Sequence, residues 1–246
     1  MAKLAIIGGT GLTTLKNLEI LNREVVHTPY GEPSGPLTHG ELCGQQVVFL
    51  ARHGYGHTIP PHKVNYRANI WALQQAGASE VIAVNAVGGI TPGMRPGRLV
   101  FPNQIIDYTW SRVNTYFEEG LSYVTHIDFT EPYCESLRER LIAGARAIGV
   151  DAGERGTYGA TQGPRLETTA EINRLERDGC HIVGMTGMPE AALARELELC
   201  YASVAVVANM AAGRGTGRIT MEEIELHLKT GMESVRTLLE HVLPNI

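Results

Sequence analysis

Basic residues, cysteines and long apolar runs are all scarce in this chain of 246 residues, and each scarcity excludes a class of protein. Lys and Arg number 21 against 26 Asp and Glu, which gives a net charge of −5. Nucleic acids and anionic membranes bind basic surfaces, so neither is expected as a partner. A membrane-spanning helix needs roughly 20 apolar residues, and the sequence has no such run. The first apolar run is short and ends in glycines, unlike a signal peptide, so we expect a cytoplasmic protein.

The cysteines are few and widely spaced. They are Cys43, Cys134, Cys180 and Cys200, and no two of them form a CxxC pair. Closely spaced cysteines are typical of zinc and redox sites, and thiols in the cytoplasm are kept reduced. We therefore expect reduced thiols, most of them buried.

Histidines are the other candidate metal ligands. His53, His57 and His62 are close in sequence, but glycines and prolines separate them, so they do not lie on one helix face. No HExxH motif and no neighbouring cysteine completes a zinc site. Neither a metal ion nor another cofactor is expected.

Segments with strand and helix patterns alternate along the chain, without repeats, low-complexity tracts or a domain linker. Strands are expected at Leu4–Ile7, Glu24–Thr28, Gln46–Leu50, Val81–Val84, Leu99–Phe101, Ile105–Asp107, Arg155–Ala160, His181–Gly184 and Cys200–Val207. Helices are expected at Val64–Gln75, Glu135–Ile148, Ala170–Asp178, Met188–Leu197 and residues 221–242. The alternation predicts a single α/β domain over residues 1–246, with a central mixed β-sheet flanked by helices. Residues 108–133 lack clear periodicity, which favours a long loop that covers a site.

Polar or glycine-rich segments follow five of these strands. They are Gly8–Gly11, Arg52–His53, Asn85–Ala86, Met185–Thr186 and Asn209. In an open α/β sheet, ligands bind beyond the carboxyl ends of the strands. We therefore expect the five segments to converge on one pocket.

The glycine segment after the first strand allows three interpretations. A dinucleotide site is disfavoured, because Thr14 stands where the GxGxxG motif needs its third glycine and no acidic residue ends a second strand. A purely structural turn is the second interpretation. The third, which we favour, is a cradle in which backbone N–H groups and the Thr10 hydroxyl hold a small oxyanion.

Other strand-end residues also fit a site for an anion and its substrate. Arg52 can bind phosphate through two parallel hydrogen bonds and His53 can add a donor, although such a pair is also common on protein surfaces. Asn209 follows the most apolar strand, where it either caps its own turn or binds a ligand. Glu167 follows a Gly-Pro turn, where it either binds a ligand or complements the start of a helix.

Together, these segments resemble the trimeric nucleoside phosphorylases, a family that includes purine nucleoside and methylthioadenosine phosphorylases. The matching segments cover nearly the whole chain and are IIGGTGL (6–12), ARHGYGH (51–57), KVNYRANIWAL (63–73), NAVGGI (85–90), TEPYC (130–134), QGPRLET (162–168), GMTGMPEAALARE (184–196) and CYASVAVVAN (200–209). The resemblance implies a nucleoside phosphorylase-like fold and a homotrimer. It also implies a nucleoside and inorganic phosphate as the small-molecule substrates.

The resemblance further implies a phosphate site on the segments that follow the strands. The corresponding residues of this chain are Thr10, Arg52, His53, Asn85, Ala86 and Thr186. In the family the last of these contacts ribose as well as phosphate, and the residue at the place of Met185 lies beneath the ribose.

Two positions imply a 6-oxopurine base and are the expected catalytic residues. Adenine-specific relatives carry Asp at the place of Asn209 and a small residue at the place of Glu167. An Asn can donate to N7 and to a 6-carbonyl oxygen, and a Glu can accept from N1–H, which adenine lacks. A mismatch at such groups changes specificity by orders of magnitude. One departure from the family is Leu166, where many relatives have a Phe that stacks on the base.

A third position concerns the 5′ end of the ribose. Inosine-cleaving relatives place a His before the Glu-Glu pair that starts the last helix, and this chain has Met221 there. Met suits a thioether, so Met221 and Ile224 are expected to form an apolar 5′ pocket, unless Met221 belongs only to the helix core. His126, in the long loop, corresponds to a residue that reaches into the neighbouring subunit's site.

These residues imply phosphorolysis of S-methyl-5′-thioinosine to hypoxanthine and 5-methylthioribose 1-phosphate, as a step of purine salvage. Methylthioadenosine, inosine and guanosine are the alternative substrates. A nucleoside-binding module without catalysis is the alternative outside the enzymes, and the intact phosphate set argues against it.

Overall fold

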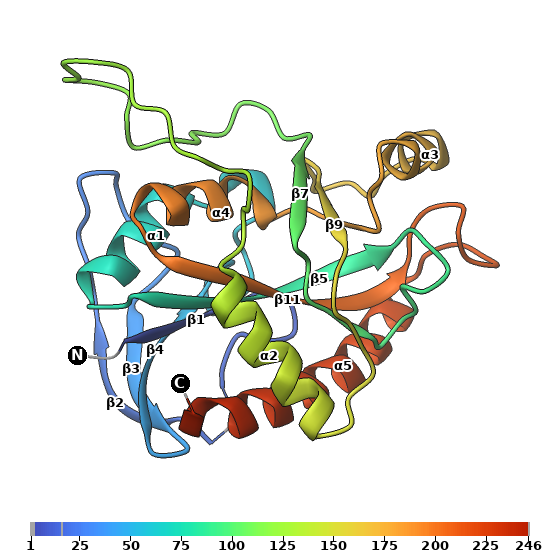
Figure 1. The fold of residues 1–246 in the computed structure, drawn as a ribbon, viewed down its shortest axis with the longest axis horizontal. Helices are drawn as coiled ribbons and strands as arrows, with labels where there is room; N and C mark the ends of the chain where they lie inside the picture. Colours follow the sequence, from blue (N-terminus) through green and yellow to red (C-terminus); the bar gives the residue numbers. More distant parts are fainter. Residues whose placement is uncertain (1–2, 16, 246) are drawn as a thin grey trace.

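A mixed sheet of eleven strands forms the centre of the part of the chain that the structure describes (Figure 1). This computed structural model describes residues 3–15 and 17–245. The strands are β1 (Leu4–Gly8), β2 (Glu19–Glu24), β3 (Leu37–Leu42), β4 (Gln45–Ala51), β5 (Glu80–Gly89), β6 (Leu99–Val100), β7 (Gln104–Asp107), β8 (Ala152–Gly153), β9 (Thr157–Ala160), β10 (Ile182–Gly184) and β11 (Cys200–Met210). Their order is β2-β3-β4-β1-β5-β10-β9-β7, and β11 branches from β5 toward β6 and β8. The predicted α/β class with a central mixed sheet is thus confirmed.

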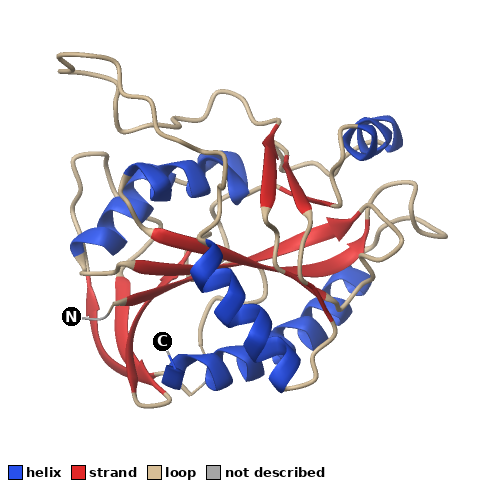
Figure 2. Ribbon diagram, in the orientation of Figure 1, coloured by secondary structure: helices blue, strands red, loops and turns tan. Residues whose placement is uncertain are grey.

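Helices cover both faces of the sheet (Figure 2). They are α1 (Tyr66–Gln75), α2 (Glu135–Ala147), α3 (Thr169–Arg177), α4 (Gly187–Glu196) and α5 (Met221–Val242), with short 3-10 helices η1 (Pro61–Lys63) and η2 (Leu243–Asn245). The apolar sides of α1 and α4 pack into one core cluster, and those of α2 and α5 into another. Since both faces of the central strands are covered, β5 and β11 are almost continuously apolar.

Capping residues explain where several helices begin and end. The Asn65 side chain accepts from the N–H of Ala68 at the start of α1, and Gly77 follows its end with a φ of +94°. At the start of α3, Thr168 and Glu171 form a reciprocal capping box.

Three of the predicted strands differ from their predicted ranges by three residues or more at one end. β2 lies at Glu19–Glu24 rather than Glu24–Thr28, and all six of its residues are exposed, so it has no alternating apolar pattern to find. β5 continues to Gly89 and β11 to Met210. Asn85, Ala86 and Asn209 therefore lie within strands, not beyond their ends.

A disulfide joins Cys134 to Cys200, so the prediction of reduced thiols is wrong for this pair. The other two cysteines are free, Cys43 at the surface and Cys180 in the interior. The bonded residues are 66 positions apart, with Cα atoms at 5.1 Å. The fold brings them together because Cys134 precedes α2 and donates its N–H to the carbonyl of Tyr201 in β11, at 2.8 Å. A search for closely spaced cysteines does not detect such a tertiary pair.

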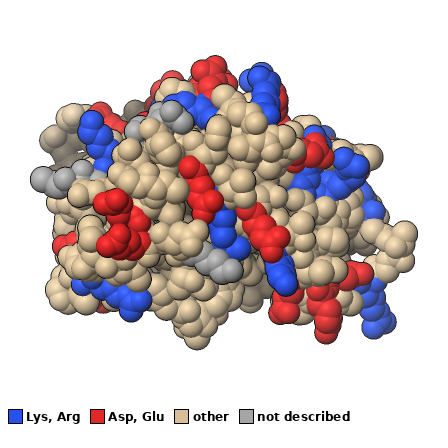
Figure 3. Space-filling model, turned by 90° about the horizontal axis from the view of Figure 1, so that it is seen from below, with Lys and Arg blue, Asp and Glu red and all other residues tan. Residues whose placement is uncertain are grey.

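Residues 108–133, here called the arm, form the predicted long loop and project away from the sheet between β7 and α2 (Figure 1). The face of the molecule seen from below in Figure 3 carries acidic and basic side chains interspersed among neutral ones. Across residues 3–15 and 17–245, no helix is long and apolar enough to cross a membrane.

Candidate functional site

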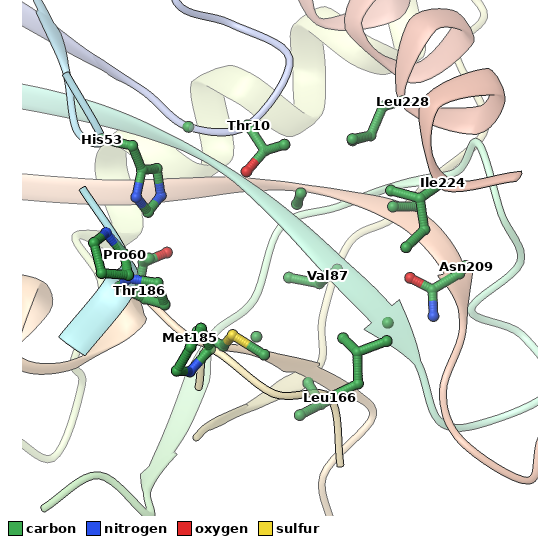
Figure 4. Close-up of a pocket in the computed structure, with 18 of the residues that line it drawn as sticks. Thr10, His53, Pro60, Val87, Leu166, Met185, Thr186, Asn209, Ile224 and Leu228 are labelled. Atoms are coloured by element: carbon green, nitrogen blue, oxygen red, sulfur yellow. The ribbon is translucent and has the colours of Figure 1, made fainter. Parts of the chain in front are cut away.

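A cavity of about 350 Å³ lies beside β5, β10 and β11 and the start of α5 (Figure 4). The five segments predicted to converge do meet here. The predicted residues that line the cavity are Thr10, Arg52, His53, Ala86, Leu166, Glu167, Met185, Thr186, Asn209 and Ile224. Thr10, His53 and Thr186 lie at one end, and Leu166 and Asn209 at the other (Figure 4).

The sheet supplies one wall of the cavity, because β5 extends past its neighbour β1. The pairing of β1 with β5 ends at Ile7 and Ala83, and the pairing of β10 with β5 begins at Gly88. Between these points, residues 84–87 have no strand partner on that edge within the described chain. The interruption leaves backbone groups that other partners must satisfy.

Two of these backbone groups point away from the strand on this edge: one is bound by Arg52 and the other is left for a ligand. The Val84 carbonyl accepts from Nη1 of Arg52 at 2.9 Å. Backbone groups of alternate residues point to the same edge of a strand. The N–H of Ala86 is therefore directed from this edge into the cavity, where an anion can accept it.

The glycine segment forms a tight turn above this edge. The Leu12 N–H donates to the Gly9 carbonyl at 3.0 Å, and Gly11 has the φ of +83° that a type II turn requires. A Cβ on Gly9 would lie 2.8 Å from Nη1 of Arg52, so only glycine permits this close packing. The turn presents the Thr10 hydroxyl to the cavity (Figure 4).

Arg52 is held by a buried carboxylate that the sequence reasoning missed. Glu190 in α4 accepts from Nε at 2.6 Å and from Nη2 at 2.7 Å, and both side chains are 0% exposed. Burial lowers the pKa of Arg52, but the charge and hydrogen bonds of Glu190 outweigh it and hold the pKa above its ordinary value. The signal was present, because Glu190 shares a helix face with Leu193 and Ala194 and so had to be buried.

This pairing leaves Arg52 able to bind an anion. A guanidinium has five N–H groups. Glu190 and Val84 accept three of them, one each from Nε, Nη1 and Nη2. One N–H on Nη1 and one on Nη2 are free of hydrogen bonds to the described residues, and Arg52 lines the cavity. Although the Arg52 side chain is 0% exposed, it borders the cavity, so an anion bound there meets its positive charge and its two unused N–H groups.

His53 was expected to donate a second hydrogen bond to phosphate, but the structure presents it as an acceptor. Its Nδ1 lies 2.8 Å from the Ile59 carbonyl, which can only accept, so Nδ1 carries the hydrogen. Burial and then the charge of Arg52 lower the pKa of His53 to about 4. The ring is therefore neutral at neutral pH, and its Nε2 is an acceptor suited to the O–H of hydrogen phosphate.

The depressed pKa of His53 predicts a loss of stability in acid. Between pH 6.5, its ordinary pKa, and about 4, the unfolded chain binds a proton at this residue and the folded chain does not. Stability should thus fall as the pH decreases through this range. His53→Gln should weaken that dependence, as measured by urea unfolding at pH 7 and pH 5. An equal loss of stability in wild type and variant would show that His53 is not buried as a neutral ring.

Asn85 lies behind the cavity wall, although it was expected to touch phosphate. It is 1% exposed, accepts from the Ser203 hydroxyl at 2.8 Å and donates to Oγ1 of Thr186 at 2.9 Å. The Thr186 hydroxyl also interacts with the hydroxyl of Tyr158, and these two partners together fix its position in the cavity wall. Asn85 is therefore placed to act through Thr186. Ser203 could be suspected from the sequence, as a hydroxyl inside an otherwise apolar strand.

The two residues expected to recognise the base stand near the far end of the cavity. Asn209 follows a β-bulge in β11, where the pairing register shifts and re-aims the side chain. Its Nδ2 donates to the Met210 carbonyl at 2.8 Å, which orients the amide and leaves its second N–H for a ligand. Glu167 accepts from the Thr161 hydroxyl at 2.6 Å. Since Thr168 and Glu171 cap α3, Glu167 is not used as a capping residue.

Besides Asn85, two predicted residues lie outside the cavity lining. Met221, the first residue of α5, is 61% exposed, and the apolar wall on this side is formed by Ile219, Ile224 and Leu228. Met221 is thus exposed at the start of α5, which the resemblance of this helix start to that of the relatives did not reveal. His126 is exposed on the arm, and its role in a neighbouring subunit stays a prediction.

The histidines near the cavity do not form a metal-binding cluster in the described part of the chain. His53 and His57 rings pack with centroids 4.8 Å apart. No group of three or more His, Cys, Asp or Glu side chains among the described residues is arranged to hold a metal ion.

Comparisons with known proteins agree with this geometry. The chain is 59% identical, over 99% of each chain, to a protein of Pseudomonas syringae pv. tomato named probable S-methyl-5′-thioinosine phosphorylase. It is 48% identical to the 6-oxopurine nucleoside phosphorylase of Pyrococcus furiosus, over 97% of this chain and 91% of that one. The solved structure of methylthioadenosine phosphorylase from Schistosoma mansoni in complex with adenine matches with a TM-score of 0.94 at 33% identity, covering 100% of this chain and 92% of that one. The sequence profile of the phosphorylase superfamily matches residues 3–244. With this profile match and these near-complete alignments, the chain belongs to the phosphorylase superfamily.

Proposed function

We propose that this protein is a pentosyltransferase that cleaves S-methyl-5′-thioinosine with inorganic phosphate, releasing hypoxanthine and 5-methylthioribose 1-phosphate. The observation that carries the proposal is one cavity with three chemically distinct walls. Thr10, His53 and Thr186 lie at one end, Asn209 and Leu166 lie toward the other, and Ile224 and Leu228 form an apolar side. Arg52 follows β4 next to His53, and Glu167 follows Leu166 in the chain. The relatives named for this nucleoside and for 6-oxopurine nucleosides support it.

Phosphate is the nucleophile in this proposal, and the protein positions it. Thr10, Arg52, Thr186 and the N–H of Ala86 donate to its oxygens, and His53 accepts its hydrogen. Phosphate attacks C1′ of the ribose as the bond to N9 of the purine breaks, and the sugar passes through an oxocarbenium-like state. Such positioning accounts for much of the lowering of a barrier in transfer reactions.

The leaving base takes up the electrons of the broken bond. Asn209 donates to N7 or O6 and stabilises the charge that develops there. Glu167 accepts from N1–H and fixes the orientation of the base. Overall, the proton that phosphate loses ends on hypoxanthine, so no cofactor or metal is needed.

The decisive experiment compares phosphate-dependent release of base from S-methyl-5′-thioinosine, inosine and methylthioadenosine. We expect the first to have the highest kcat/KM. A preference for inosine or methylthioadenosine would support the phosphorylase activity but contradict the proposed substrate. No phosphate-dependent turnover of any of the three would favour a nucleoside-binding module without catalysis.

The apolar side of the cavity predicts which residue selects the 5′ group. Ile224→Ser should lower kcat/KM for S-methyl-5′-thioinosine by about tenfold more than for inosine, since one apolar contact is worth about 1–3 kcal/mol. Met221→Ser is the matched control, because Met221 is exposed and should change neither substrate's kcat/KM appreciably. A larger effect at Met221 than at Ile224 would mean that the start of α5 closes over the bound nucleoside.

A homotrimer, a cytoplasmic location and a role in purine salvage complete the proposal. Light scattering tests the trimer, and a monomer would contradict a shared-site role for His126. Because thiols are kept reduced in the cytoplasm, this location requires that the Cys134–Cys200 pair be reduced there. Alkylating the thiols in intact cells before extraction would show whether this pair is reduced there.

A further inference from the structure

The side chain of Arg112, in the arm, packs back against the body of the protein. Nε donates to the side-chain oxygen of Gln162 at 3.2 Å. Nη1 donates to the carbonyls of Met185 at 2.8 Å and Met188 at 2.6 Å. Nη2 donates to the carbonyls of Thr161 at 3.2 Å and Gln162 at 2.8 Å. All five N–H groups of the guanidinium thus have an acceptor.

Five of the six acceptors belong to two connecting segments that carry cavity residues. The sixth is the Tyr66 hydroxyl of α1, at 3.4 Å from Nη1. Residues 161–168 follow β9, and residues 185–188 follow β10, its parallel neighbour. The first segment carries Glu167 and the second carries Met185 and Thr186, and all three line the cavity. Arg112 lies between the segments and bonds to both.

The link from Arg112 to Glu167, the carboxylate expected to bind the base, passes through one residue, Thr161. The carbonyl of Thr161 accepts from Arg112, and its hydroxyl donates to Glu167 at 2.6 Å. On the other segment, Arg112 bonds to the carbonyl of Met185, whose side chain points into the cavity (Figure 4). A shift of Arg112 would therefore move both groups.

We propose, resting on the proposed function, that Arg112 is a positioning residue for phosphorolysis. It fixes the spacing between the segment that orients the base and the segment that orients ribose and phosphate. A guanidinium suits this task because it is planar, permanently charged and has five donors in a fixed arrangement. Lys has only three donors on a flexible stem and can satisfy only part of the set.

A role limited to anchoring the arm is the alternative, and the structure offers separate anchors for that. Arg67 in α1 donates to the Thr115 carbonyl at 3.3 Å and to Glu118 at 2.7 Å. Glu196 in α4 accepts from the Thr115 hydroxyl at 2.6 Å. Arg67 thus holds the arm without a hydrogen bond to either connecting segment among the described residues, which makes it a matched control.

The kinetic test compares Arg112→Ala, Arg112→Lys and Arg67→Ala, with S-methyl-5′-thioinosine and phosphate varied separately. Arg112→Ala should lose about 100-fold in kcat/KM for the nucleoside, the loss typical of a displacement near 1 Å, chiefly through kcat. Arg112→Lys should retain part of the activity, and Arg67→Ala nearly all of it. Added guanidinium ion, below denaturing concentrations, should partly restore Arg112→Ala alone. Equal losses at Arg112 and Arg67 would overturn the proposal, as would wild-type kinetics in Arg112→Ala.

Amide hydrogen exchange tests the same proposal without turnover. Arg112→Ala should exchange faster in residues 161–168 and 185–188, and Arg67→Ala only within the arm. Unchanged exchange of both segments in Arg112→Ala would overturn the positioning role. Wild-type protein that lacks phosphate-dependent turnover would overturn the proposed function instead, and the exchange comparison would still decide whether Arg112 fixes the segments.

Discussion

Replacing Glu190 with Gln is expected to lower the free energy of unfolding by about 3–5 kcal/mol, because it leaves the buried charge of Arg52 without a counter-charge. The carboxylate accepts three hydrogen bonds, two from Arg52 and one from the Tyr201 hydroxyl at 2.8 Å. A Gln side chain has the same shape but only one oxygen that can accept these hydrogen bonds. Its amide nitrogen would face the N–H or O–H donors of Arg52 and Tyr201, with which it cannot pair. The KM for phosphate should rise as well, since Arg52 would no longer be held with two N–H groups toward the cavity.

Urea unfolding and phosphate titration of the activity measure the two effects. Glu154→Gln is the control, because Glu154 also pairs with an arginine, Arg146, through two hydrogen bonds. That pair is exposed, at 67% for Arg146 and 42% for Glu154. Water replaces its interactions, so little change in stability is expected. If Glu190→Gln were as stable as Glu154→Gln, the buried pair would not support the fold as argued above.

Asn209→Asp is expected to shift the preference between 6-oxopurine and adenine nucleosides by about 100-fold toward adenine. The carboxylate cannot donate to a 6-carbonyl oxygen and repels it, whereas a protonated or bridged Asp suits N7 and the amino group of adenine. Losing one hydrogen bond to the purine, which gains negative charge as it leaves, costs about 3 kcal/mol. This corresponds to about a 100-fold decrease in kcat/KM.

The ratio of kcat/KM for S-methyl-5′-thioinosine and methylthioadenosine measures this shift. Asn22→Asp makes the same change of charge on the exposed strand β2, far from the cavity residues in the sheet order, and should leave the ratio unchanged. If Asn209→Asp lowered both values equally, Asn209 would stabilise the leaving base without selecting it.

Much of the fold follows from local sequence patterns. β1, β4 and β11 were predictable because short apolar runs bounded by glycine or polar residues are typical of buried strands. The cavity residues Thr10 and Arg52 were predictable because they directly follow such strands, where an α/β sheet places its ligands. The position of strand β2 was not predictable, because an exposed edge strand lacks an apolar pattern.

The partners within the site depend on tertiary packing and could not be read from local patterns. Glu190 meets Arg52 across 138 positions of the sequence, and Arg112 meets Met185 across 73. The apolar face of α4 required Glu190 to be buried, but it could not name the residue that balances its charge. The exposure of Met221 depends on how α5 is rotated against the sheet, which one turn of sequence does not fix.

The interruption of strand pairing along β5 has an evolutionary consequence. The proposed anion cradle at this interruption uses backbone groups and the buried pair of Arg52 and Glu190, whereas the groups expected to choose the nucleoside stand on β11, α5 and the segment before α3. In this arrangement, mutations that alter the choice of nucleoside need not touch the cradle. The chain is similar both to a methylthioadenosine phosphorylase and to a 6-oxopurine nucleoside phosphorylase, as expected if the two parts vary separately.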